Sequence, residues 1–141
     1  MRMFAIAALV LAASVTAVQA QDRTPSPHGA KVFFVGLKDG ATVTNPVTVK
    51  FGIKGMTLAP AGTKMDNSGH HHLLIDTDPP ADLSQPLPAT DNIKHFGKAQ
   101  TETILTLTPG KHTLQLLLAD GNHIPHNPPV LSEKITITVS P

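Results

Sequence analysis

Histidine is the residue type in this sequence that most clearly suggests a chemical role. Eight histidines occur among 141 residues, and there is no cysteine. Three are consecutive, His70-His71-His72, and the segment His123-Ile124-Pro125-His126 holds two more in a loop stiffened by proline. Imidazole is the commonest side-chain metal ligand, although it also titrates near neutral pH and forms hydrogen bonds. The sequence therefore predicts a metal site, and histidines that only form hydrogen bonds are the alternative.

The available ligand types limit which metal such a site would take. Imidazole suits copper, zinc and nickel, whereas thioether sulfur favours Cu(I). Met56 and Met65 precede the histidine triplet and are candidate thioether ligands, with hydrophobic packing as their alternative role. A histidine-rich, cysteine-free site favours copper first and zinc second.

The elements that must position these histidines are β-strands. Apolar and polar residues alternate as in strands in six segments: 31–37, 47–54, 71–76, 101–108, 111–119 and 135–139. Most of the 13 prolines lie between these segments, and no long helical period is present. The pattern predicts an all-β fold, a single immunoglobulin-like antiparallel β-sandwich over residues 31–141. Residues 21–30 are expected to form a flexible N-terminal tail, and residues 78–91 a proline-rich loop.

Strand geometry then predicts which histidines meet. Neighbouring residues of a strand point to opposite faces, so His70 and His72 share one face and His71 points to the other. If strands 71–76 and 111–119 are antiparallel, the loop before the first and the loop after the second lie at one end of the sandwich. The predicted ligands at that end are His70, His72, His123 and His126, with His95 and His71 in reserve.

Two histidines are expected to lie outside the site. His112 begins its strand at the opposite end and shares a face with Leu114 and Leu116, so it is expected to form hydrogen bonds. His28 lies in the predicted tail and is given no ligand role.

Residues 1–20 have the features of a secretory signal peptide. Arg2 is followed by a short apolar run and by Val18-Gln19-Ala20, which predicts cleavage after Ala20 and export to a bacterial periplasm. The apolar run is too short to span a membrane, and nothing later is apolar enough. Without Arg2 the chain has ten basic and ten acidic residues, with no basic stripe, so nucleic acid is not an expected partner.

No motif of a known catalytic site is present. The sequence contains no HExxH, GxSxG, phosphate-binding loop or GxGxxG pattern. We therefore expect a protein that is not an enzyme.

Three motifs carry a resemblance to a known family. Residues 68–76 (SGHHHLLID), 95–102 (HFGKAQTE) and 118–126 (LADGNHIPH) resemble an exported bacterial family, domain-of-unknown-function family 4399. The resemblance covers about residues 30–139 and implies export and a single small domain, but no activity.

Three functions remain open from the sequence. The first is a periplasmic protein that binds, buffers or delivers copper, with zinc as the second metal. The second is a structural or interaction module of the cell envelope, and the third is a copper-dependent redox enzyme. A metal ion is the expected partner, and a periplasmic protein is a further candidate.

Overall fold

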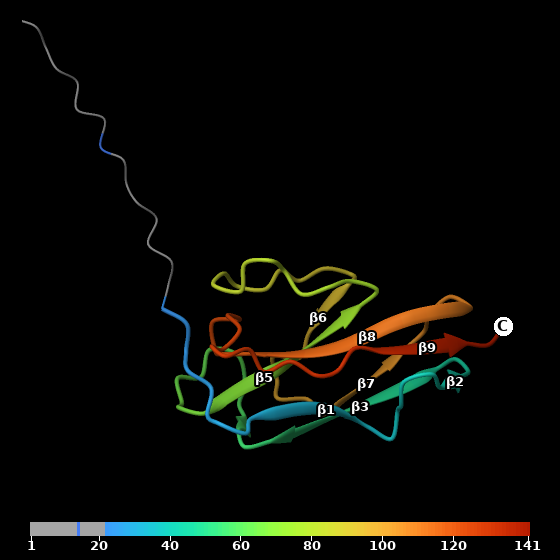
Figure 1. Ribbon diagram of the computed structural model, residues 1–141, viewed down its shortest axis with the longest axis horizontal. Helices are drawn as coiled ribbons and strands as arrows, with labels where there is room; N and C mark the ends of the chain where they lie inside the picture. The colour runs from blue at the N-terminus through green and yellow to red at the C-terminus, as the bar shows by residue number, and fades with distance from the viewer. Residues whose placement is uncertain (1–13, 15–21) are drawn as a thin grey trace, which may run out of the picture.

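The alternating segments form two β-sheets in the computed structural model, which describes residues 14 and 22–141 (Figure 1). Within these residues the strands are β1 Lys31–Val35, β2 Thr42–Val43, β3 Val47–Lys54, β4 Thr57–Leu58, β5 Ser68–Ile75, β6 Ile93–His95, β7 Glu102–Leu105, β8 Gly110–Ala119 and β9 Ile135–Val139. No helix occurs in this part of the chain. The prediction of an all-β sandwich is confirmed.

The smaller sheet has the order β1-β3-β7, and both of its pairs are antiparallel. The larger sheet has the order β2-β9-β8-β5-β4, with β6 also paired to β5. Two-residue strands β2 and β4 join it in parallel, whereas β5, β6, β8 and β9 pair antiparallel. The antiparallel register of β5 and β8 sets His70 opposite Ala119 and Ile75 opposite Leu114. The start of β5 therefore lies beside the end of β8, as the sequence predicted.

The main core lies between the two sheets. On β3, Val47, Val49 and Phe51 are buried while Thr48 and Lys50 are exposed, as expected for a strand with one face in water. Strand β5 is buried at all eight positions. Its full burial requires a cover on both faces, since successive residues of a strand point to opposite sides of the sheet.

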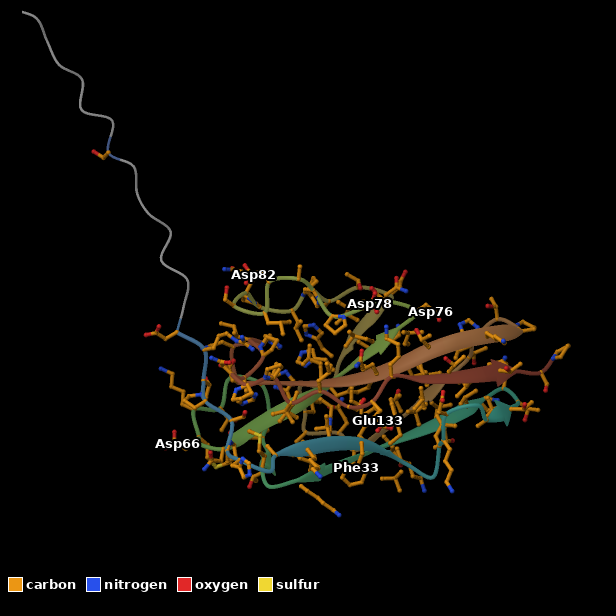
Figure 2. All side chains as sticks on the ribbon, viewed as in Figure 1. Phe33, Asp66, Asp76, Asp78, Asp82 and Glu133 are labelled. Atoms are coloured by element: carbon orange, nitrogen blue, oxygen red, sulfur yellow. The ribbon has the colours of Figure 1, made fainter. Side chains whose placement is uncertain are left out.

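The cover on the outer face of the larger sheet is the proline-rich segment between β5 and β6. We call residues 77–92 the strap. It contains no strand and passes over the sheet near β6 and β8 (Figure 1; Asp78 and Asp82 of the strap are labelled in Figure 2). Leu87 of the strap forms a second, smaller apolar cluster with residues of the outer face: Leu74, Ile93, Leu117 and Ala119. The sheet is thus enclosed on both sides.

The segment expected to be a flexible tail contacts the loop after β8. The amide of Ser26 donates to the carbonyl oxygen of Asn127 at 3.2 Å, and the amide of Asn127 donates to the carbonyl oxygen of Thr24 at 2.9 Å. The guanidinium of Arg23 donates to the carbonyl oxygens of Pro125 and His126. These contacts fix the backbone on either side of His126.

The predicted signal peptide, apart from Ser14, lies outside the described residues. Among the residues that are described, no helix is long and apolar enough to cross a membrane.

Candidate metal centre

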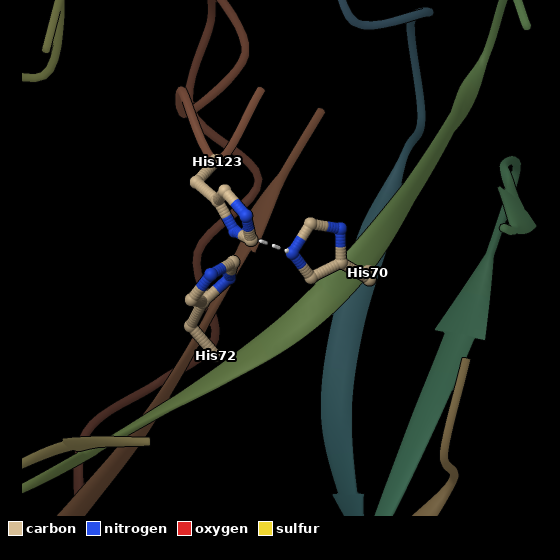
Figure 3. A group of neighbouring side chains, drawn as sticks. All are labelled: His70, His72 and His123. Carbon is tan, nitrogen blue, oxygen red and sulfur yellow. Dashed lines mark hydrogen bonds between the residues drawn. The ribbon is translucent and has the colours of Figure 1, made fainter. Parts of the chain in front are cut away.

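Three histidines meet on the outer face of the larger sheet, beneath the strap. His70 and His72 are two positions apart on β5, on the same face as Leu74, and neither side chain has any exposed surface. His123 comes from the loop between β8 and β9. Each of the three offers a ring nitrogen, and these nitrogens all lie within 4.8 Å of one another (Figure 3). The cluster is therefore compact enough to share one metal ion.

A tight turn brings His123 back over β5. The carboxylate of Asp120 accepts hydrogen bonds from the amides of Asn122 and Ile124, and the amide of His123 donates to the carbonyl oxygen of Asp120. His123 itself has a φ of 63°, a left-handed conformation that is uncommon for a residue with a side chain. Asn67, Asp76 and Ala99, outside the cluster, also have a positive φ, so at His123 the conformation shows that the turn is held by its hydrogen bonds. In this turn Nδ1 of His123 lies 3.1 Å from Nε2 of His70 (Figure 3).

His95 adds a fourth imidazole at the rim of this cluster. It pairs with His72 across β5 and β6. Its ring centroid lies 4.3 Å from that of His72 and 4.9 Å from that of His123. Its Nε2 lies 3.2 Å from the carbonyl oxygen of Pro88 in the strap. An Nε2–H that donates to this oxygen leaves the Nδ1 lone pair free, the arrangement that orients many metal-binding histidines.

Burial keeps these imidazoles neutral. It lowers the pKa of His72 to about 2, with a further contribution from the neighbouring His70 and His95. Burial also lowers the pKa of His70 to about 4, followed by the effect of His123, and it lowers the pKa of His95. A metal binds only the neutral form of imidazole. Near neutral pH these three side chains thus present lone pairs without first losing a proton.

Several of the buried ring nitrogens have no hydrogen-bond partner among the described residues. They include Nδ1 of His70 and both ring nitrogens of His72. Each buried, unpaired polar group costs about 1–3 kcal/mol, so the fold is less stable for having them. Metal–nitrogen bonds of about 2.0–2.1 Å in a tetrahedral site place two nitrogens roughly 3.3–3.4 Å apart. The separation of 3.1 Å between His70 Nε2 and His123 Nδ1 is close to that value. The three nitrogens as a group lie within 4.8 Å of one another, so the rings would draw closer together on binding one ion.

Comparison with known families identifies the chain. The model of the family described as Domain of unknown function (DUF4399) matches residues 49–140. The chain belongs to this family. No curated protein and no solved structure matches it. The matched span of the DUF4399 domain includes all four histidines of the cluster.

Two predicted ligands lie elsewhere in the DUF4399 domain. His71 points into the core between the sheets, where its ring packs against Phe51 with centroids 5.1 Å apart, and burial lowers its pKa to about 4 with a smaller effect of His70. His126 is buried with its Nε2 3.0 Å from the carbonyl oxygen of Ser68. The structure thus places the ring of His95, named in reserve, beside the group of His70, His72 and His123, while His126 lies apart from it. The cluster lies where β5 begins and β8 ends, the end of the sandwich that the strand directions predict, and on the outer face of the larger sheet.

The remaining candidates of the DUF4399 domain have other surroundings. Met56 packs against the core between the sheets, on the opposite side of β5 from the cluster, and Met65 is 48% exposed. His112 lies near the far end of β8, where Nδ1 is 2.7 Å from the carboxylate of Asp76 and Nε2 is 2.8 Å from the carbonyl oxygen of Thr108. The salt bridge to Asp76 agrees with the expected hydrogen-bonding role of His112.

Proposed function

We propose that this domain binds one copper ion through His70, His72 and His123, with His95 as a fourth ligand, and that it buffers or delivers this metal. Zinc is the second candidate. The observation that carries the proposal is the meeting of three imidazole ring nitrogens within 4.8 Å of one another, on side chains of which two are fully buried.

The alternative, histidines that only form hydrogen bonds, describes other histidines of the same chain. His112 and His126 have oxygen partners at 2.7–3.0 Å. His72 has no partner for either ring nitrogen among the described residues. His71 is likewise buried with both ring nitrogens unpaired, but its ring packs against Phe51 in the core. His72 differs because one of its ring nitrogens lies within 4.8 Å of nitrogens of His70 and His123, and a shared ion would give these nitrogens a partner.

Ligand chemistry favours copper over zinc within this proposal. The cluster consists of imidazoles and has neither thiolate nor carboxylate among the three grouped residues. For a given set of nitrogen ligands, affinity rises along the first-row divalent metals to a maximum at Cu²⁺ and falls at Zn²⁺. Neither methionine is placed with the imidazoles, so the proposal does not include thioether ligands.

The cellular location is part of the proposal. The signal-like segment at residues 1–20 supports export and a mature N-terminus at Gln21. Mass spectrometry of the protein in a periplasmic extract should show the loss of these residues. A full-length chain in the cytosol would contradict export.

Metal titration tests the central claim. Chelator-treated protein is titrated with Cu²⁺ and separately with Zn²⁺ against a competing chelator of known affinity. We expect one ion per chain, with the tighter binding for copper. His123→Gln should weaken binding by about a hundredfold or more, because a total of about 10–16 kcal/mol over four ligands is about 3 kcal/mol for each. His126→Gln is the matched control and should bind as the native protein does. If the native protein takes up neither metal at micromolar concentration, the proposal is wrong.

A further inference from the structure

We infer that the strap, residues 77–92, is a closing element of the metal site. Anchored by Leu87, it positions His95 and His123 as ligands and sets the rate at which the ion enters and leaves. This inference rests on the proposed function and adds to it the control of metal exchange.

Two adjacent residues of the strap contact two of the four clustered histidines. The amide of Leu87 donates to the carbonyl oxygen of His123 at 2.8 Å. The carbonyl oxygen of Pro88 lies 3.2 Å from Nε2 of His95. His70 and His72, by contrast, are fixed by their places on β5. The strap therefore acts on the two ligands that the central sheet does not position rigidly, a loop histidine and one on the short strand β6.

One buried side chain anchors the middle of the strap to the sheet, and polar contacts hold its ends, where Asp78 pairs with Lys134 and Asn92 Nδ2 donates to the Ile75 carbonyl oxygen. Leu87 is 4% exposed and is the only buried residue among residues 77–92, all of which the structure describes. It packs against the apolar residues of the outer face that flank the cluster: Leu74, Ile93, Leu117 and Ala119. Leu83 is partly buried against the same group. A long segment held by so small an apolar contact opens at a lower free energy than the sheet beneath it.

Closure of the strap decides which ligands are available. His70 and His72 have no exposed surface, so an ion reaches them only when the structure around them opens. With the strap closed, Pro88 accepts a hydrogen bond from Nε2 of His95 and so leaves Nδ1 free to bind the ion. With the strap open, His95 loses this orientation, and a site of three histidines is exposed to competing ligands.

Metal binding and closure of the strap should stabilise each other. An ion bound to His95 and His123 holds in place the two groups that the strap contacts. By thermodynamic linkage, metal then stabilises the closed strap to the same extent that the closed strap stabilises bound metal. Metal occupancy should thus be visible at Leu87, which is not itself a ligand.

The kinetics of metal release test this inference. The native protein loaded with Cu²⁺ is challenged with excess EDTA, and release is followed by the copper absorption. We expect Leu87→Ala to release copper at least tenfold faster, with a changed electron paramagnetic resonance spectrum because His95 no longer binds in one orientation. Leu87→Met should restore most of the native rate. Leu105→Ala is the matched control, since Leu105 is 6% exposed and lies on β7 in the other sheet.

The outcomes separate the inference from the proposed function. Equal acceleration by Leu87→Ala and Leu105→Ala would mean that release follows global stability, which overturns the role of the strap. A native rate and spectrum in Leu87→Ala would overturn it as well. Should Leu87→Ala not fold, hydrogen exchange of the native protein decides, because copper should slow exchange at the Leu87 amide more than at amides of β7. If copper binds without this protection, only the strap inference fails; if no copper binds, both fail.

Discussion

Replacement of His72 by leucine should make the metal-free protein more stable. Both ring nitrogens of His72 are buried without a hydrogen-bond partner among the described residues. Removing them together recovers about 1–3 kcal/mol, and a leucine of similar size, placed among the rings of His70, His95 and His123, adds a strain below about 1.5 kcal/mol. We expect a net gain of about 1–2 kcal/mol, or a rise in melting temperature of roughly 4–8 °C for a domain of this size.

Copper should make the native protein more stable than His72→Leu. At a free copper concentration one hundred times the dissociation constant, the native protein gains about 2.7 kcal/mol, and His72→Leu gains little because it has lost a ligand. Urea unfolding of both proteins with EDTA, and again with Cu²⁺, measures the two differences. His112→Leu is the control of opposite sign: both ring nitrogens of His112 are paired, with the Asp76 carboxylate and the Thr108 carbonyl oxygen, so this change should lower stability with or without metal. If His72→Leu is less stable than the native protein in EDTA, the reasoning from unpaired nitrogens is wrong.

Three further predictions concern other parts of the fold. Leu116→Ala should lower the free energy of unfolding by about 2–5 kcal/mol, because Leu116 lies in the main core and has no exposed surface. Urea unfolding measures this loss, and a smaller loss would mean that the core relaxes around the gap. The hydrogen bond to Asp76 raises the pKa of His112. The stabilisation that protonated His112 gives the folded protein is therefore complete below the ordinary imidazole pKa of about 6.5, and it is lost as the pH rises through the pKa of His112 in the folded protein. The destabilisation caused by His112→Gln should therefore be larger at acidic than at alkaline pH, and a difference independent of pH would contradict it. Gly121→Ala should weaken copper binding in the metal titration and lower the melting temperature, since a Cβ there would lie 2.4 Å from the backbone oxygen of Thr63 and displace the turn before His123; native affinity would show that the turn tolerates the displacement.

The larger strands could be predicted from the sequence because their alternation reflects burial directly. The segments predicted at 47–54 and 135–139 match β3 and β9 residue for residue. Strand β5 begins at Ser68, earlier than the predicted residue 71, because Ser68 and Gly69 pair with β4. Strands β2, β4 and β6 have only two or three residues each, too few for a period to be seen. They exist because neighbouring strands offer unpaired backbone groups, which is information from the tertiary structure.

The candidate site was predictable only as far as strand geometry reaches. Alternation correctly separated His70 and His72 from His71, since it depends on local geometry alone. The position of the His126 side chain depends on contacts between distant segments, because Pro25 forms a β-bridge with Asn127 and Pro125 forms one with Ala119. These contacts turn His126 toward Ser68, although it is only three residues from His123. The cover over the outer face was also not apparent, because a proline-rich loop with a single buried leucine has no periodic pattern.

The composition of the outer face argues that the clustered histidines serve chemistry and not packing. The same face accommodates Leu74, Leu117 and Leu87 in a tightly buried group, so the space beneath the strap suits leucine. Yet positions 70 and 72 of β5, four and two residues before Leu74, hold imidazoles that are buried, neutral and largely unpaired. A third imidazole is held over them by a residue in a strained conformation. Departures from the local rules of stability at several neighbouring positions are typical of functional sites, and a metal ion is a ligand that would pair the buried ring nitrogens of such a cluster.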